Sequence, residues 1–140
     1  MLDIWRAETC WRTAHADRVS FLIDYQAYFA AVQDALVNAR RSIHLLGWGF
    51  DPRTRLQPDG SDLCGEPDEV GRLLLRIAEE RPELDIRLLV WKSALPISAT
   101  QEFFPHKARQ WFEGSTVHFW LDDAIPFGAC HHQKALVIDD

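Results

Sequence analysis

The chain has 140 residues, of which 47% are hydrophobic, and a formal net charge of −6 at pH 7. This length fits one small domain or part of a larger one, and the apolar share is that of an ordinary globular protein. The acidic balance argues against a nonspecific nucleic-acid binder, although a short basic site would still permit nuclease chemistry.

The N-terminal quarter of the chain is expected to form a strand followed by a helix. Residues 1–18 are interpreted as a lead-in, and the apolar run 19–23 as a strand. Asp24 is a suitable N-cap for the helix. The apolar positions of that helix, at helical spacing, are Tyr25, Phe29, Val32 and Leu36. Arg40 and Arg41 suit the negative end of the helix.

The middle of the chain predicts a buried strand, a loop and a second helix. The strand covers 43–48, and glycines at its end allow close backbone approach. Four prolines and glycines make 51–66 an exposed loop. Pro67 is expected to open the helix and Pro82 to end it. The apolar stripe of this helix is Val70, Leu73, Leu74 and Ile77.

The rest of the chain predicts three more apolar strands, at 86–91, 117–121 and 135–138. A short helix over 103–112, ended by Gly114, lies between the first two. Strands that are apolar on both faces, alternating with amphipathic helices, indicate an α/β domain. We therefore expect residues 19–140 to form a layered α/β/α sandwich with a mostly parallel sheet. Because the chain ends just after a strand, we expect it to be truncated.

Cysteine usage and hydropathy bear on the compartment. Cys10, Cys64 and Cys130 lie far apart without CxxC spacing. This spacing argues against a disulfide framework and against thiol ligation of a metal. The sequence shows no apolar run of signal-peptide length and none of the roughly 20 residues that a membrane span needs. The expected location is the cytoplasm or a peripheral position on a membrane.

The strongest chemical signal is the C-terminal stretch HHQKALVIDD. It holds His132, Lys134 and Asp139 in the spacing H-x-K-x-x-x-x-D. On a strand, residues i and i+2 share a face, so His132 and Lys134 are expected side by side in an open cleft. An imidazole is a capable nucleophile near neutral pH, and a lysine suits a phosphate oxygen. Asp139 has an odd offset, which favours a supporting role that fixes the strand end or a neighbouring backbone.

This spacing resembles the HKD motif of the phospholipase D superfamily. The HHQK form is similar to that of the phospholipases in the family, and SIHLLGWGFDP is similar to its early strand and loop. The resemblance covers essentially the whole chain, but its specific part is the HKD segment. It implies one half of a phospholipase D-like fold carrying the first HKD motif, with His132, Lys134 and Asp139 as the catalytic set.

The resemblance also implies a reaction. One family histidine attacks phosphorus to form a phosphohistidine, and a second histidine protonates the leaving alcohol and then activates water or an alcohol. The second HKD motif would come from a missing C-terminal half or from a dimer partner. Because of the odd offset of Asp139, the acid that orients His132 is expected from beyond residue 140. No metal or other cofactor is implied. The implied partners are a phospholipid substrate and a membrane surface, with no nucleic acid.

Several readings stay open. Trp48 and His131 are candidates for substrate binding, although Trp48 suits a core and His131 suits a supporting role. Cys130 is interpreted as a small buried residue. The alternative functions are a cardiolipin synthase-type phosphatidyltransferase, a nuclease of the same superfamily, and a non-catalytic scaffold with half a site. Because only one motif is present, the 140-residue chain alone is expected to be inactive.

Overall fold

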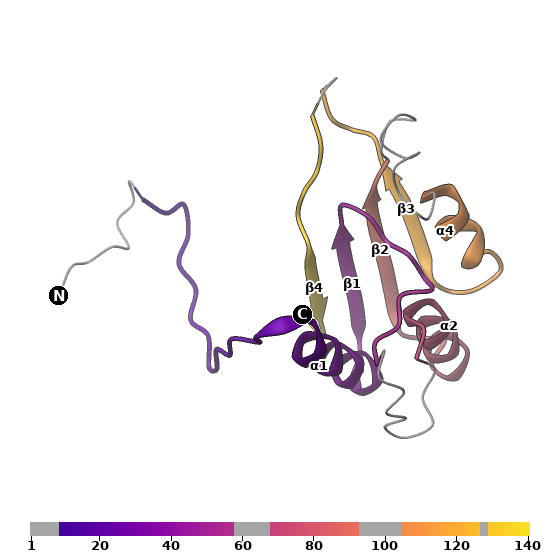
Figure 1. The fold of residues 1–140 in the computed structure, drawn as a ribbon, viewed down its shortest axis with the longest axis horizontal. Coiled ribbons are helices and arrows are strands. Elements are labelled where there is room, and N and C mark those ends of the chain that lie inside the picture. The colour runs from indigo at the N-terminus through magenta and orange to yellow at the C-terminus, as the bar shows by residue number, and fades with distance from the viewer. Residues whose placement is uncertain (1–8, 58–67, 93–104, 127–128) are drawn as a thin grey trace.

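The computed structural model describes residues 9–57, 68–92, 105–126 and 129–140 (Figure 1). Within these ranges the helices are α1 (Asp24–Asn38), α2 (Val70–Glu80) and α4 (Pro105–Trp111). The strands are β1 (Ser42–Gly47), β2 (Asp85–Trp91), β3 (His118–Asp122) and β4 (Ala135–Ile138). Some predictions fall outside the described ranges. These are most of the loop predicted over 51–66, with Cys64 in it, the helix start at Pro67, and the first two residues of the helix predicted over 103–112.

The four strands form one mixed sheet in the order β3-β2-β1-β4. β1 pairs with β2, and β2 with β3, in parallel, whereas β4 pairs with β1 in antiparallel fashion. The predicted α/β class is confirmed. The antiparallel strand follows from the path of the chain, which leaves β3 at one edge and returns along the far edge of the sheet (Figure 1).

The core lies on one face of this sheet. Alternate strand residues such as Ile43, Ile86 and Leu88 are fully buried, and they share one hydrophobic cluster with residues of all three helices. The predicted stripe of α2 is confirmed, since Val70, Leu73, Leu74 and Ile77 are all buried.

The opposite face of the sheet is open among the described residues. Leu46, Leu89, Trp120 and Val137 are each between 38% and 47% exposed there. The described elements therefore make two layers, one of helices and one of strands. The third layer of an α/β/α sandwich stays a prediction.

The strand predicted over residues 19–23 is wrong. These residues have no strand assignment, and Val19, Phe21 and Ile23 are 75%, 91% and 82% exposed. Branched apolar residues favour extended backbone, but a strand also needs a neighbour with free backbone groups. Both sides of β1 are taken by β2 and β4, and residues 19–23 pair with neither of the edge strands β3 and β4.

Helix α1 differs from the sequence prediction in its first residue, in its apolar face and in the cation at its C-terminal end. Asp24 is the first residue of the helix and Ile23 holds the cap position, so the predicted boundary is one residue off. The Asp24 carboxylate still accepts a hydrogen bond from the Ala27 N–H at 3.1 Å, as an N-cap side chain would. The predicted apolar face is only partly buried, because Tyr25 is 77% exposed. At the other end, the cation beside the helix is Arg81, whose guanidinium donates to the Ala39 carbonyl.

Candidate active site at the start of strand β4

The antiparallel pairing of β4 decides where the motif lies. Ala135, the first residue of β4, pairs with Leu46 near the end of β1. The residues just before it therefore lie at the carboxyl edge of β1, where parallel α/β sheets commonly carry their ligand sites. His131, His132 and Lys134 reach this edge from the long connection after β3.

Asp139 lies at the other end of β4 and binds backbone. Its carboxylate accepts hydrogen bonds from the N–H groups of Arg40 at 2.9 Å, Arg41 at 2.6 Å and Ser42 at 3.1 Å. These bonds, that from Arg41 foremost, hold the pKa of Asp139 below its ordinary value. Its backbone N–H also donates to the Ser42 carbonyl at 3.0 Å.

Asp139 therefore fixes the turn between α1 and β1, in agreement with the supporting role argued from its odd offset. Among the three residues predicted to be catalytic, Asp139 binds backbone and does not line the cavity that Lys134 lines. Its own backbone has a positive φ of 59°, a conformation that aspartate adopts more readily than most residues. Arg40 and Arg41, which the sequence placed at the helix end, contribute here through their backbone N–H groups, and the Arg41 guanidinium also donates to the Asp139 carbonyl.

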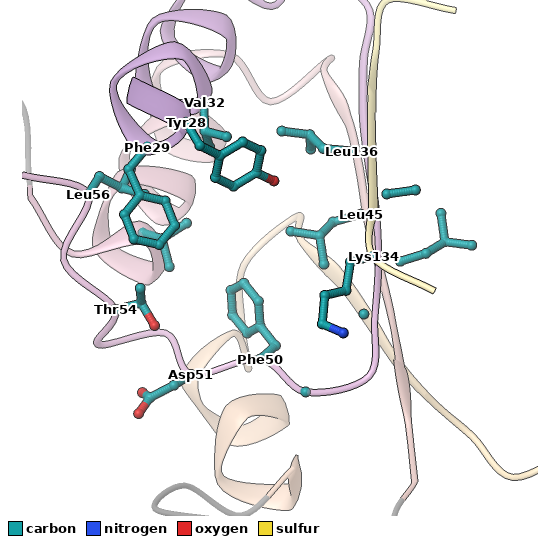
Figure 2. Close-up of a pocket in the computed structure, with 15 residues that line it drawn as sticks. Tyr28, Phe29, Val32, Leu45, Phe50, Asp51, Thr54, Leu56, Lys134 and Leu136 are labelled. Carbon is teal, nitrogen blue, oxygen red and sulfur yellow. The ribbon is translucent and has the colours of Figure 1, made fainter. Parts of the chain in front are cut away.

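Lys134 lines a cavity of about 200 Å³ between α1, β1 and the loop that follows β1. Figure 2 shows its ammonium and the rings of Tyr28, Phe29 and Phe50 directed toward the same space. No ion pair joins Lys134 to a carboxylate of the described residues, so the ammonium is open to an anionic ligand. Asp51 also lines the cavity, but its carboxylate is held by Arg53 at 2.7 Å.

Burial by itself would raise the pKa of Asp51, but hydrogen bonds from the Arg53 side chain and backbone outweigh it and leave the pKa below the ordinary value. Asp51 is therefore ionised at neutral pH and carries its own counter-charge. It does not compete for Lys134. The cavity thus combines apolar walls with one cation at its rim.

His132 lies against Trp48. The two ring centroids are 5.7 Å apart, and Trp48 in turn stacks on the buried Trp91 at 6.0 Å. Trp48 is half-buried and supports the imidazole; it is not among the residues that line the cavity. His132 does not line that cavity either, so its pairing with Lys134 on one face stays a prediction.

His131 has a partner that the sequence did not reveal. Its Nδ1 lies 2.5 Å from Oδ2 of Asp122, the last residue of β3, whose side chain is 15% exposed. The other carboxylate oxygen accepts the Ala124 N–H at 3.0 Å. This pair lies beside a cavity of about 40 Å³ that Gln133 also lines.

The pair with Asp122 is compatible with the supporting role predicted for His131, and the sequence held a signal for this partner. Asp122 ends a buried strand, and acidic residues at the carboxyl ends of parallel strands commonly belong to sites. Because His131 and Gln133 line one cavity and Lys134 another, successive residues here point to alternate sides of the chain.

Neither thiols nor metal ligands form a further candidate site within the described residues. Cys130 is exposed, so the prediction of a buried Cys130 is wrong. It precedes β4 on an exposed connection rather than on the sheet. No group of three or more metal-ligating side chains occurs in the described ranges. Nor is any helix there both long and apolar enough to cross a membrane.

Comparison of the sequence with protein-family models and with curated proteins found no match.

Proposed function

We propose that the chain is part of a phospholipase D-type phosphodiesterase that cleaves phospholipids through a phosphohistidine intermediate. Residues 19–140 would form one half of a layered α/β/α fold, with a further helical layer over the open face of the sheet. The proposal is supported by the placement of the H-x-K residues at the carboxyl edge of β1 and by the bonds that Asp139 makes to the backbone.

The observation that carries the proposal is the setting of Lys134. An ammonium without a carboxylate partner among the described residues borders a mainly apolar cavity, and it follows two residues after His132, whose imidazole lies against Trp48. A lysine of this kind suits one phosphate oxygen. The apolar wall fits the aliphatic part of a lipid better than a sugar-phosphate backbone, which favours a phospholipid over a nucleic acid.

The reaction balances with one further histidine. An imidazole nitrogen forms a bond to phosphorus while the bond from phosphorus to the leaving alcohol oxygen breaks, and a second imidazole gives that oxygen a proton. Water then attacks phosphorus, loses a proton to the second imidazole and releases the first. Lys134 would stabilise negative charge on the phosphoryl oxygens throughout. The second imidazole would come from another H-x-K motif or a second copy of the chain.

The test is choline release from a short-chain phosphatidylcholine, measured over a range of protein concentrations. We expect negligible turnover by the monomer, and turnover that appears with dimerisation or with a supplied second motif. His132→Ala and Lys134→Ala should each lower that rate by on the order of 100-fold or more. His118→Ala is the matched control, since His118 stacks on Trp120 away from this edge. A rate unchanged in His132→Ala would refute the proposal.

A further inference from the structure

The cavity beside Lys134 has a composition that selects for one kind of ligand. Most of its lining is aromatic or aliphatic and comes from three segments: α1, β1 with the loop after it, and the start of β4. Tyr28, Phe29 and Val32 supply the α1 wall. Sites for small molecules commonly have this pattern of apolar walls with few polar groups.

The charges around the cavity do not cancel at its rim. Asp51 is neutralised by Arg53, whereas Lys134 has no ion-pair partner among the described residues. The cavity therefore offers an apolar interior and one net positive charge. This combination is complementary to an amphiphile with an anionic head and an aliphatic tail.

The volume sets the length of that tail. An apolar cavity of about 150 Å³ accommodates the six carbons of benzene. By the same ratio, the cavity of about 200 Å³ accommodates about eight carbons. Each methylene moved from water into such a space should tighten binding about fourfold.

We propose that this cavity binds the aliphatic chain of a phosphate-headed amphiphile, with Lys134 on the phosphate. The inference deepens the proposed function, on which it rests for the phosphate, by assigning the cavity to the first carbons of a lipid chain. Free phosphate shares the head-group chemistry, but it has no tail to fill the apolar part.

The experiment is a calorimetric or NMR titration of the 140-residue chain with inorganic phosphate and with butyl, hexyl, octyl and decyl phosphate, all below their micellar concentrations. We expect affinity to rise about fourfold per methylene and to level off near the octyl chain. Inorganic phosphate should bind far more weakly. Affinity that does not depend on chain length would overturn the inference.

Two variants separate the tail from the head. Val32→Trp should fill the cavity and abolish the dependence on chain length. Its control is Val137→Trp, which places the same ring on the open face of the sheet and should leave the series unchanged. Lys134→Met should lower the binding affinity for every alkyl phosphate by about the same factor. Octyl glucoside, an uncharged amphiphile, should bind the parent and Lys134→Met with equal affinity.

Melting curves show whether each variant folds. If affinity still rises with alkyl chain length in a folded Val32→Trp protein, the assignment of the cavity is contradicted. The two proposals fail separately. Chain-length dependence without histidine-dependent choline release would refute only the proposed function. Choline release without chain-length dependence would refute only the assignment of this cavity.

Discussion

Replacing Gly71 with alanine is expected to destabilise the protein, although alanine is the better helix former. Gly71 is the second residue of α2, and its N–H donates to the Pro52 carbonyl at 2.8 Å. A Cβ added there would lie 2.4 Å from the Pro52 Cβ, 2.9 Å from the Pro52 carbonyl oxygen and 2.9 Å from Nε1 of Trp111. The loop after β1 therefore packs against bare backbone.

Two effects oppose each other in Gly71→Ala. Helix propensity favours alanine by up to about 1 kcal/mol. Overpacking costs about 1–3 kcal/mol, and the upper half of that range applies because the nearest atoms belong to a rigid ring and to backbone. The net loss is then about 2 kcal/mol. With an unfolding entropy of about 0.3 kcal/mol/K for 140 residues, Tm should fall by roughly 7 °C.

The assay is thermal unfolding followed by circular dichroism. Gly49→Ala is the control, because a Cβ at that exposed glycine would meet nothing within 4 Å and the backbone there has no positive φ. Its Tm should stay within about 2 °C of the parent. A Gly71→Ala protein that melts at or above the parental temperature would refute the packing argument.

Two further predictions concern carboxylates. Asp139→Asn should lower Tm at pH 7 and make Tm depend less on pH in the acidic range. The reason is that backbone bonds keep the pKa of Asp139 low in the folded protein. Its stabilisation is therefore complete above the unfolded pKa of about 3.9 and is lost as pH falls through the folded pKa. Parallel Tm curves for the two proteins between pH 2 and 7 would contradict this. Asp122→Asn should remove the Nδ1–H tautomer of His131 from ¹⁵N NMR spectra. The control is Asp123→Asn, which loses only the exposed ion pair with Lys92 and should keep that tautomer. An unchanged His131 spectrum in both variants would mean that the Asp122 carboxylate does not select the tautomer.

Strong periodicity made most of the fold predictable. The α2 stripe and the continuous apolar runs of β1 and β2 each have one clear structural solution, because a helix or strand with such a pattern must bury it. The run at 19–23 has the same local character, yet it forms no strand. Strand formation depends on a partner that local pattern does not specify.

The site was predictable where it depends on spacing within one segment. The odd offset of Asp139 correctly separated it from His132 and Lys134, and its backbone bonds agree with that separation. The position of Asp122 at a strand end marks it as a candidate site residue, but its pairing with His131 could not be predicted, because that contact depends on the return of the chain across the sheet. The orientation of Trp48 could not be predicted either, because it depends on stacking against Trp91, which lies on another strand.

The short strand β4 joins two ends of the motif that have different tasks. Lys134 borders the cavity at one end, and Asp139 is bonded to the turn before β1 at the other. Five residue steps of strand cover roughly 17 Å. The number of residues between lysine and aspartate is therefore a fixed length, matched to the height of the sheet. A deletion within residues 135–138 could not be absorbed locally: either Asp139 would lose the turn or the strand would slip by one residue, and such a slip turns every side chain to the other face.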